Sequence, residues 1–387
     1  MNVGQGTPRS RLVSTLRDLI EVPSTHPPGD CSAICDYIES RLRTAGIRAE
    51  RLSRNPGSDN VLARFGGGSP QLAFTSHVDT VDAGDRRSWV TDPYRATVVD
   101  DRIYGIGASN CKAAVAVHLC LAEDLARMPP PTAGEIVFSF CSDEENLGPH
   151  GALYLKECGA LKPSWLVVGG NSGNRMVLEE RGVLWMRILA YGRAAHAGTP
   201  EAGDNAILRM CRLMAYLTPL LANTLSNRTA QGMRATFNIG RITGGRNANV
   251  VPEQCQVDLD RRLLPAEHVT EAFEEIESIL ARSGEPEGTV SVMRLLGTKG
   301  FASSRNGRCV QSLARAIASV TGKDAQFLVS AGASDGRYFA QDGIEVVGFG
   351  PGEPDQGHAA NEFACIGPME EAYEIQLRMM RDLMGIE

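Results

Sequence analysis

The stretch QLAFTSHVDTV, residues 71–81, decides the fold, because an apolar run gives way there to polar residues. The run predicts a buried strand, and His77 and Asp79 stand where it ends. Two later stretches, GEIVFSFCS (134–142) and SWLVVGGNSG (164–173), have the same form. Between the first two, residues 111–128 have the apolar spacing of a helix. This alternation predicts an α/β domain with a largely parallel sheet.

Polar residues follow each of the three predicted strands. His77 ends the first, the run Asp143-Glu144-Glu145 follows the second, and Asn171 follows the third. The carboxyl ends of parallel strands line the usual ligand crevice of such a sheet. We therefore expect these side chains to lie together at a functional site.

The pattern of predicted strands and helices changes from about Arg181. The stretches 182–198, 205–225, 234–245, 254–265, 267–284 and 288–297 predict a strand, a helix, two strands, a helix and a strand. This order is typical of a small α+β sandwich. We therefore predict a catalytic domain from residues 1–180 and 293–387, with residues 181–292 inserted into it as a lid.

The composition excludes several classes of partner. The 387 residues carry a net charge of -7 with no basic patch, so we expect neither nucleic acid nor an anionic membrane as a partner. No signal peptide or membrane-length apolar run is visible, which favours a cytoplasmic protein. The ten cysteines lack CxxC pairing, which suits reduced thiols.

Five motifs occur in order along the chain: SHVDTV (76–81), YGIGASNCK (104–112), SDEENLG (142–148), GRAAHAG (192–198) and GPGEPDQGHAANEF (350–363). As a set they resemble the co-catalytic zinc hydrolases that include acetylornithine deacetylase, succinyl-diaminopimelate desuccinylase, aminoacylase and glutamate carboxypeptidase. The resemblance covers nearly the whole chain. It implies a zinc-peptidase-like catalytic domain and an inserted lid domain that pairs two chains into a homodimer.

The resemblance also implies roles for residues of the catalytic domain. Asp79 would fix the imidazole of His77 from behind, and Glu144 would be the general base. The Asn110–Cys111 peptide bond would be cis. The implied metal ligands are His77, Asn110, Glu145, Asn171 and His358.

Three residues of the lid match the family pattern as well. His196 matches a histidine that reaches across the dimer to the oxyanion of the substrate. Asn249 and Arg262 match residues that grip a substrate carboxylate, and the fork of an arginine donates two parallel hydrogen bonds to such a group. The substrate expected from these matches is a small acidic molecule.

Two positions depart from the family pattern, because Asn110 stands in the place of the aspartate that bridges two metals and Asn171 stands where the family has an aspartate or glutamate ligand. An amide oxygen carries no charge and bridges two cations poorly. We therefore expect a site remodelled for one divalent ion, manganese or zinc, held by Glu145, His358 and Asn110. His77 with Asn171 would make a weaker second site, so two ions stay possible.

Three functions remain open for a site of this kind. Cleavage of an unactivated amide benefits from two metals, whereas an electron-poor substrate needs less help. The same superfamily contains 5-nitroanthranilate aminohydrolase, and the two asparagines favour such a single-metal aminohydrolase acting on an amino-aromatic acid. The alternatives are an N-acyl amino acid deacylase or carboxypeptidase, and an inactive carboxylate-binding protein.

Simpler interpretations exist for single residues. Residues 143–146 could be the acidic first turn of a helix with Asp143 as its N-cap. His77 and His358 could each be core histidines, and Arg262 a charge at the rim. No histidine and asparagine partner the thiols near the site, so a cysteine nucleophile is not expected.

Overall fold

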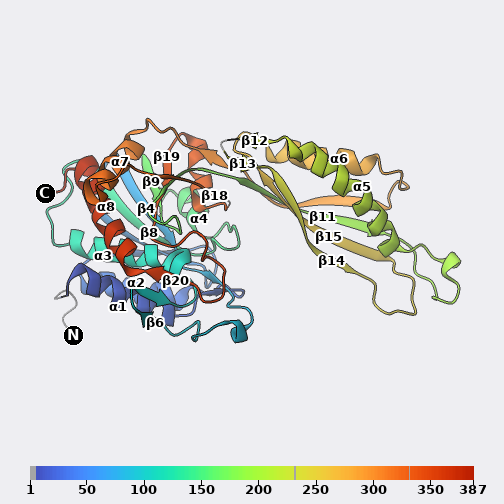
Figure 1. The fold of residues 1–387 in the computed structure, drawn as a ribbon, viewed down its shortest axis with the longest axis horizontal. Coiled ribbons are helices and arrows are strands. Elements are labelled where there is room, and N and C mark those ends of the chain that lie inside the picture. The colour runs from blue at the N-terminus through green and yellow to red at the C-terminus, as the bar shows by residue number, and fades with distance from the viewer. Residues whose placement is uncertain (1–5, 231, 331) are drawn as a thin grey trace. The chain divides into compact units, whose positions relative to one another are not determined.

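The computed structural model describes residues 6–230, 232–330 and 332–387. The chain divides into two compact units (Figure 1). Unit 1 comprises Met1–Leu178, Ser303–Leu328 and Ser334–Glu387, and unit 2 comprises Glu179–Ala302 and Val329–Ala333. Unit 2 contains the expected lid range of 181–292 and continues to Ala302. Its last long strand runs over Val290–Thr298, and Phe301 and Ala302 pair with Glu180 and Glu179 of the same unit.

The large sheet has the strand order β17-β10-β19-β9-β4-β8-β3-β2, and β18 pairs with β10. The four neighbours β19, β9, β4 and β8 run parallel, which confirms the α/β class predicted from the sequence. The pairs β3–β8, β2–β3, β10–β19 and β10–β17 are antiparallel, so the parallel part is the centre of the sheet. The bounds are β2 (Ala49–Ser53), β3 (Asp59–Gly66), β4 (Gln71–His77), β8 (Glu135–Cys141), β9 (Trp165–Val168), β10 (Met176–Glu180), β17 (Phe301–Ala302), β18 (Phe327–Ser330) and β19 (Glu345–Gly348).

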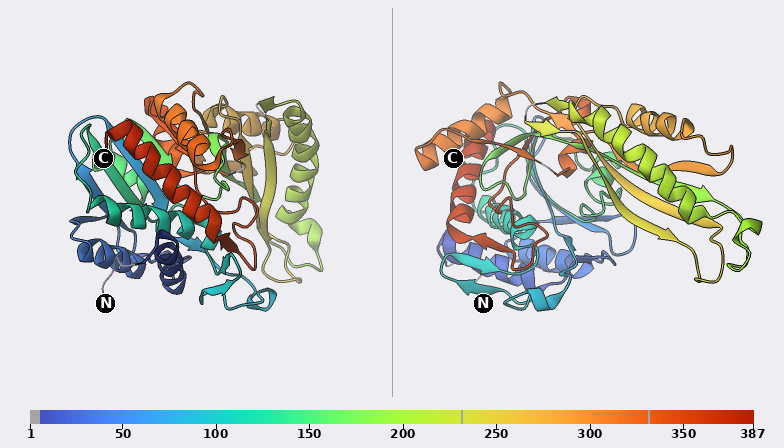
Figure 2. Two further views of the ribbon diagram at one scale, coloured as in Figure 1. Left: turned by 60° about the vertical axis from the view of Figure 1, so that its left-hand side comes forward. Right: turned by 45° about the vertical axis from the view of Figure 1, so that its right-hand side comes forward.

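The helix α3 (Ala113–Leu125) packs on β4 and β8. Its residues are almost all apolar and buried, because α1 (Pro8–Glu21) and α8 (Ile366–Met384) pack against it in turn. Figure 2 shows α8 running beside α7 (Arg308–Thr321). Unit 1 also contains α2 (Ser32–Thr44) and the short α4 (Ala152–Glu157).

Unit 2 is a four-stranded antiparallel sheet in the order β14-β15-β11-β16, with α5 and α6 along one face (Figure 1). Burial alternates along β15, where Cys255, Val257 and Leu259 point into the core. The chain order of strand, helix, two strands, helix and strand confirms the predicted sandwich. The bounds are β11 (Gly182–Tyr191), α5 (Ala206–Ser226), β14 (Thr236–Gly244), β15 (Gln254–Leu263), α6 (Val269–Ala281) and β16 (Val290–Thr298), and a short β12 (Thr229–Ala230) pairs with β13 (Met233–Arg234).

Two small sheets shape the edge of unit 1. The strands β20 (Phe363–Cys365), β7 (Arg102–Tyr104) and β6 (Thr97–Val99) form one of them, and β1 (Thr25–His26) pairs with β5 (Thr80–Val81) in the other. The first of these brings the segment before Phe363 beside the turn that follows Tyr104. Among the described residues, no helix is both long enough and apolar enough to cross a membrane.

Candidate metal centre

The ends of β4 and β8 bring three ligand side chains together. His77, the last residue of β4, stands opposite Cys141, the last residue of β8, in parallel register. Glu144 and Glu145 follow directly in the loop after β8. One ligand atom from each of His77, Glu144 and Glu145 lies within 4.8 Å of the others. The structure thus gathers these groups where the strand pattern placed them.

Asp79 lies behind His77 and orders this part of the site. The ring nitrogen Nδ1 of His77 donates to the carbonyl oxygen of Asp79 at 3.0 Å and lies 3.4 Å from its carboxylate. The other carboxylate oxygen of Asp79 accepts from the backbone N–H of Glu145 at 3.0 Å. Because Nδ1 carries the proton, a neutral His77 presents the lone pair of Nε2, 3.8 Å from Glu144. This is the arrangement that suits a metal-binding imidazole.

Burial and the neighbouring His77 shift the pKa of Glu144 in opposite directions. Burial raises the pKa of the Glu144 carboxyl to about 8, although His77 pulls it down. Burial by itself lowers the pKa of His77, but Cys111 and Glu144 beside it raise that pKa well above its ordinary value. A carboxylate with a raised pKa is a stronger base, so Glu144 suits proton transfer near neutral pH.

Asn110 and His358 approach Glu145 from two distant parts of the chain. The amide nitrogen of Asn110 lies 3.0 Å from Glu145 Oε1 and 3.2 Å from His358 Nε2. His358 Nε2 is itself 2.9 Å from Glu145, and this hydrogen bond raises the pKa of His358. The side chain of His358 is 53% exposed, so this edge of the cluster is open to solvent.

A tight turn presents Asn110. Gly107 has a φ of 73°, and a Cβ at that position would lie 2.4 Å from Cγ2 of Thr80. The Asn110–Cys111 peptide bond is cis, as the resemblance implies. The sequence of small residues in YGIGASNCK thus has a local structural reason.

Asn171 lies near this turn, and its side chain hydrogen-bonds to the backbone of another segment. Its amide nitrogen donates to the carbonyl oxygen of Pro354 at 3.3 Å. Gly357 sits between the two asparagines, because a Cβ there would be 3.0 Å from Nδ2 of Asn171 and 3.3 Å from Cβ of Asn110. The role of Asn171 as a metal ligand stays a prediction.

The helical interpretation of residues 143–146 is wrong. The segment forms a turn in which Asp143 has a φ of 64° and accepts at its carbonyl from Gly148 N–H at 2.7 Å. The carboxylate of Asp143 accepts from the backbone N–H of His150 at 3.1 Å. Asp143 therefore shapes the loop, which leaves Glu144 and Glu145 free to face the cluster.

Two groups near the cluster were missed by sequence reasoning. The hydroxyl of Tyr338 donates to the carbonyl of Leu147 at 2.8 Å and accepts from Arg337 Nη2 at 2.8 Å. Asp335 is buried close by, and burial raises its pKa to about 6. The motif SDGRY (334–338) carries these residues, but no local pattern separates it from an ordinary polar turn.

The second missed group is Glu362, which is 1% exposed. Its carboxylate accepts from the backbone N–H groups of Gly107, Ser109 and Asn110 at 2.8–2.9 Å. Burial raises the pKa of Glu362 to about 7, and these three hydrogen bonds act in the opposite direction. Only its place in the last motif could have drawn attention to it.

The three lid residues all lie in unit 2. His196 and Asn249 are exposed on adjoining segments, where Ala197 N–H donates to the Asn249 carbonyl at 3.0 Å. His196 Nδ1 accepts from Gly198 N–H at 3.0 Å, so a neutral ring carries its proton on Nε2. Arg262 donates to Asp260 at 2.8 Å. Their proposed contacts with a substrate stay predictions.

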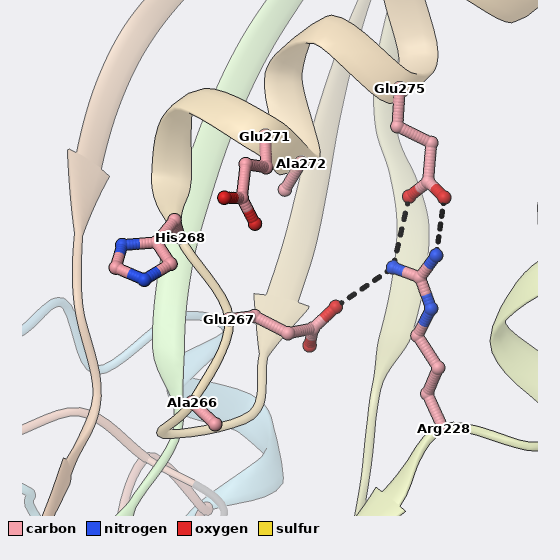
Figure 3. A pocket seen from close by; sticks show the side chains of 7 residues that line it. All are labelled: Arg228, Ala266, Glu267, His268, Glu271, Ala272 and Glu275. Atoms are coloured by element: carbon pink, nitrogen blue, oxygen red, sulfur yellow. Dashed lines mark hydrogen bonds and ion pairs between the residues drawn. The ribbon is translucent and has the colours of Figure 1, made fainter.

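Unit 2 also contains a pocket of about 380 Å³ beside the start of α6 (Figure 3). Arg228 lies at one side of the residues drawn and donates to Glu275 and Glu267, with nitrogen–oxygen distances of 2.5–3.2 Å. In the described chain, its side chains do not bring three metal-ligand atoms together. We therefore assign the pocket no part in metal binding.

The chain also contains ten cysteines and the buried histidine His118. The ten cysteines are unpaired in the structure. His118 is fully buried in α3, 3.2 Å from the hydroxyl of Ser76, and burial lowers its pKa to about 3.

The cluster fits a divalent metal ion. It combines two imidazoles, two carboxylates and an amide, and zinc and manganese accept nitrogen and oxygen ligands of these kinds. His77 has a partner that fixes its ring, as metal-binding histidines usually do. The amide nitrogen of Asn110 cannot ligate a metal, so ligation requires the other amide orientation, which turns Oδ1 toward Glu145.

Comparisons with known proteins agree with this site. The model of a family described as Peptidase family M20/M25/M40 matches residues 73–384. A succinyl-diaminopimelate desuccinylase from Halorhodospira halophila is 28% identical over 386 residues, covering 97% of this chain and 99% of the relative. Another from Aromatoleum aromaticum is 29% identical over 374 residues, covering 93% and 94%. The matches confirm the resemblance inferred from the motifs.

Solved structures share the fold. An M20 family metallo-carboxypeptidase from Sulfolobus solfataricus superposes with a TM-score of 0.77 at 18% identity, covering 96% of this chain and 98% of that chain. This similarity supports the division into a catalytic domain and a second, sheet-rich domain.

Proposed function

Because the chain belongs to peptidase family M20/M25/M40 and is therefore a metal-dependent hydrolase of C–N bonds, we propose that it cleaves the amide bond of a small N-acyl amino acid. The observation that carries this proposal is the cluster of His77, Glu144 and Glu145, with ligand atoms within 4.8 Å of one another. The desuccinylase names of the curated relatives favour an acidic acyl group or an acidic amine product.

Glu144 transfers the proton in this reaction. A divalent ion held by Glu145, His358 and Asn110 would supply Lewis acidity for the hydrolysis. Glu144 accepts a proton from the water that adds to the carbonyl carbon, and it returns that proton to the nitrogen as the C–N bond breaks. Asp79 keeps His77 in the tautomer that presents Nε2.

The metal content that we propose is one ion, manganese or zinc. Glu145 and His358 lie 2.9 Å apart and provide a charged and a neutral ligand, with Asn110 as a third. His77 and Asn171 would hold a second ion more weakly, because Asn171 donates to Pro354 and carries no charge.

A second candidate is an aminohydrolase that releases ammonia from an amino-aromatic acid such as 5-nitroanthranilate. Asn110 favours it, because an amide at the bridging position weakens a two-metal site. In that reaction water adds to the ring carbon that bears the amino group, and ammonia leaves. The electron-poor ring then does the activation that a second ion would otherwise supply.

We further propose that two chains pair through unit 2 and that His196 serves the active site of the second copy. Its exposed Nε2–H is a hydrogen-bond donor for an oxyanion. Asn249 adjoins it, and Arg262 would bind the substrate carboxylate.

One assay separates these functions. Protein loaded with Mn²⁺ or Zn²⁺ is incubated with N-succinyl and N-acetyl amino acids and, separately, with anthranilates. Released primary amine and released ammonia are then quantified independently. Amine from the acyl substrates supports the deacylase, and ammonia from anthranilates supports the aminohydrolase. A metal-loaded protein that binds these acids but releases neither product would be the inactive carboxylate-binding homologue.

A further inference from the structure

The carboxylate of Glu362 joins two parts of the candidate metal site. Its Oε1 accepts from the backbone N–H groups of Ser109 and Asn110, both at 2.8 Å. Its Oε2 accepts from Gly107 N–H at 2.9 Å. Three backbone N–H groups of one turn thus donate to a single buried side chain that lies more than 250 residues later in the chain.

The pairing of β20 with β7 explains how Glu362 reaches this turn. Phe363 stands opposite Tyr104 in antiparallel register, and Gly105 N–H donates to the backbone carbonyl of Glu362 at 3.0 Å. Glu362 directly precedes β20 and therefore lies beside the turn that presents Asn110.

The same loop carries His358 and is anchored on its other side. The side chain of Asn361 accepts from Val90 N–H at 2.6 Å and donates to the carbonyl of Ser88 at 3.0 Å. With Glu362 held as well, the loop has little freedom to carry His358 away. The distance of 3.2 Å between Asn110 Nδ2 and His358 Nε2 is set between these anchors.

We propose that Glu362 is a positioning residue that fixes Asn110 and His358 relative to each other and so determines metal affinity. This inference rests on the metal site of the proposed function. The carboxylate of Glu362 accepts from the backbone N–H groups of the turn, so Glu362 acts on Asn110 through that backbone.

The chemistry of the three donors makes the inference testable. A glutamine has the same shape but only one acceptor oxygen, so its NH₂ group would face a backbone N–H group. Either Gly107 or the pair Ser109 and Asn110 would then lose its acceptor. Even the Glu362→Gln substitution should therefore release the turn.

In the experiment, the apo protein is titrated with Mn²⁺ or Zn²⁺, and calorimetry measures the affinity for the ion. Glu362→Gln should bind the ion roughly 10- to 100-fold more weakly than the unmodified protein, as for other groups that support metal ligands. Circular dichroism and the melting temperature of the apo protein report whether each variant is folded. At saturating metal, the turnover of the variant should be closer to that of the unmodified protein than its metal affinity is.

Glu123→Gln is the matched control. Glu123 is also fully buried and carries an ion pair with Arg41 at 2.7 Å, but it lies on α3 and has no contact with the turn. It should lower the melting temperature without changing metal affinity. If Glu362→Gln does not fold, Glu362→Asp replaces it, since this variant keeps the charge but cannot reach all three N–H groups.

The outcomes are distinct. A folded Glu362→Gln or Glu362→Asp variant with unchanged metal affinity would overturn the role of Glu362 while leaving the proposed function intact. An unmodified protein that binds neither Mn²⁺ nor Zn²⁺ would instead overturn the proposed function itself, and this inference with it. Equal loss of affinity in Glu123→Gln would show that only general stability is involved.

Discussion

His358 Nε2 lies 2.9 Å from Glu145 Oε1, although 213 residues separate the two in the chain. Glu145 follows the central strand β8, whereas His358 belongs to a loop near the C-terminus. Neither segment forms the site alone. Metal binding by this pair would therefore depend on the tertiary fold, and removal of the metal should loosen both segments.

The number of bound ions should respond to Asn110. The unmodified protein should hold about one divalent ion per chain, because the amide at position 110 carries no charge to bridge a pair of cations. Asn110→Asp should raise the affinity for a second ion. Native mass spectrometry of proteins equilibrated with Zn²⁺ measures both quantities.

Asn146→Asp controls for added charge, since Asn146 is exposed in the same loop as Glu145. It should leave the stoichiometry unchanged. Two tightly held ions in the unmodified protein would contradict the single-ion site, and one ion in Asn110→Asp would be incompatible with a bridging position for residue 110.

The adjacent carboxylates should differ in what their loss does. Glu144→Gln should lower turnover roughly 10²- to 10⁴-fold while metal stays bound, because the amide keeps the shape but accepts no proton. Glu145→Gln should weaken metal binding, since a charged ligand becomes neutral. Parallel measurements of kcat and of metal content would distinguish the two roles. Near-normal turnover of Glu144→Gln would show that Glu144 is not the general base.

Much of the site could be predicted because it follows strand ends. His77 and Glu144 each stand just beyond a buried apolar run, and parallel register alone brings such positions together. The helical alternative for residues 143–146 failed because the loop turns back at Asp143, which a short acidic run does not reveal.

Other parts could not be predicted, because their partners are distant backbone groups. Nothing in the residues around Glu362 indicates that N–H groups 252 to 255 residues earlier in the chain will surround it. Tyr338 meets the carbonyl of Leu147 in the same way, 191 residues away. The family resemblance predicted His358 as a site residue. The spacing of apolar residues could not predict that Asn361 and Glu362 hold its loop.

Mixed dimers should test the proposed role of His196. A His196→Ala chain and a Glu144→Gln chain should each be inactive as homodimers. If His196 serves the second copy, mixed dimers regain one working site, because one chain supplies an intact Glu144 and the other an intact His196. Absence of activity in heterodimers that have been shown to form would place His196 in its own subunit or outside catalysis.

Stability should fall with acidification because of His118. Burial lowers its pKa from 6.5 to about 3, so the unfolded chain binds a proton in this range that the folded chain does not. The free energy of unfolding therefore decreases as the pH falls below the unfolded-state value, by up to about 1.4 kcal/mol per pH unit. His118→Gln should flatten this slope, measured by urea unfolding of the apo protein between about pH 6 and about pH 5.

The substitution His268→Gln provides the control, because His268 is exposed in unit 2. It should leave the pH slope of the unmodified protein in place. A slope that is equally steep in His118→Gln would show that another group dominates the acid response.

The most direct test of the account is to locate the ion. Crystals grown with Mn²⁺ should give one strong anomalous peak within coordination distance of Glu145 and His358, with the Asn110 side-chain oxygen turned toward it. Two peaks of full occupancy would contradict the single-ion site, and a peak elsewhere in the chain would contradict the assignment of the catalytic centre.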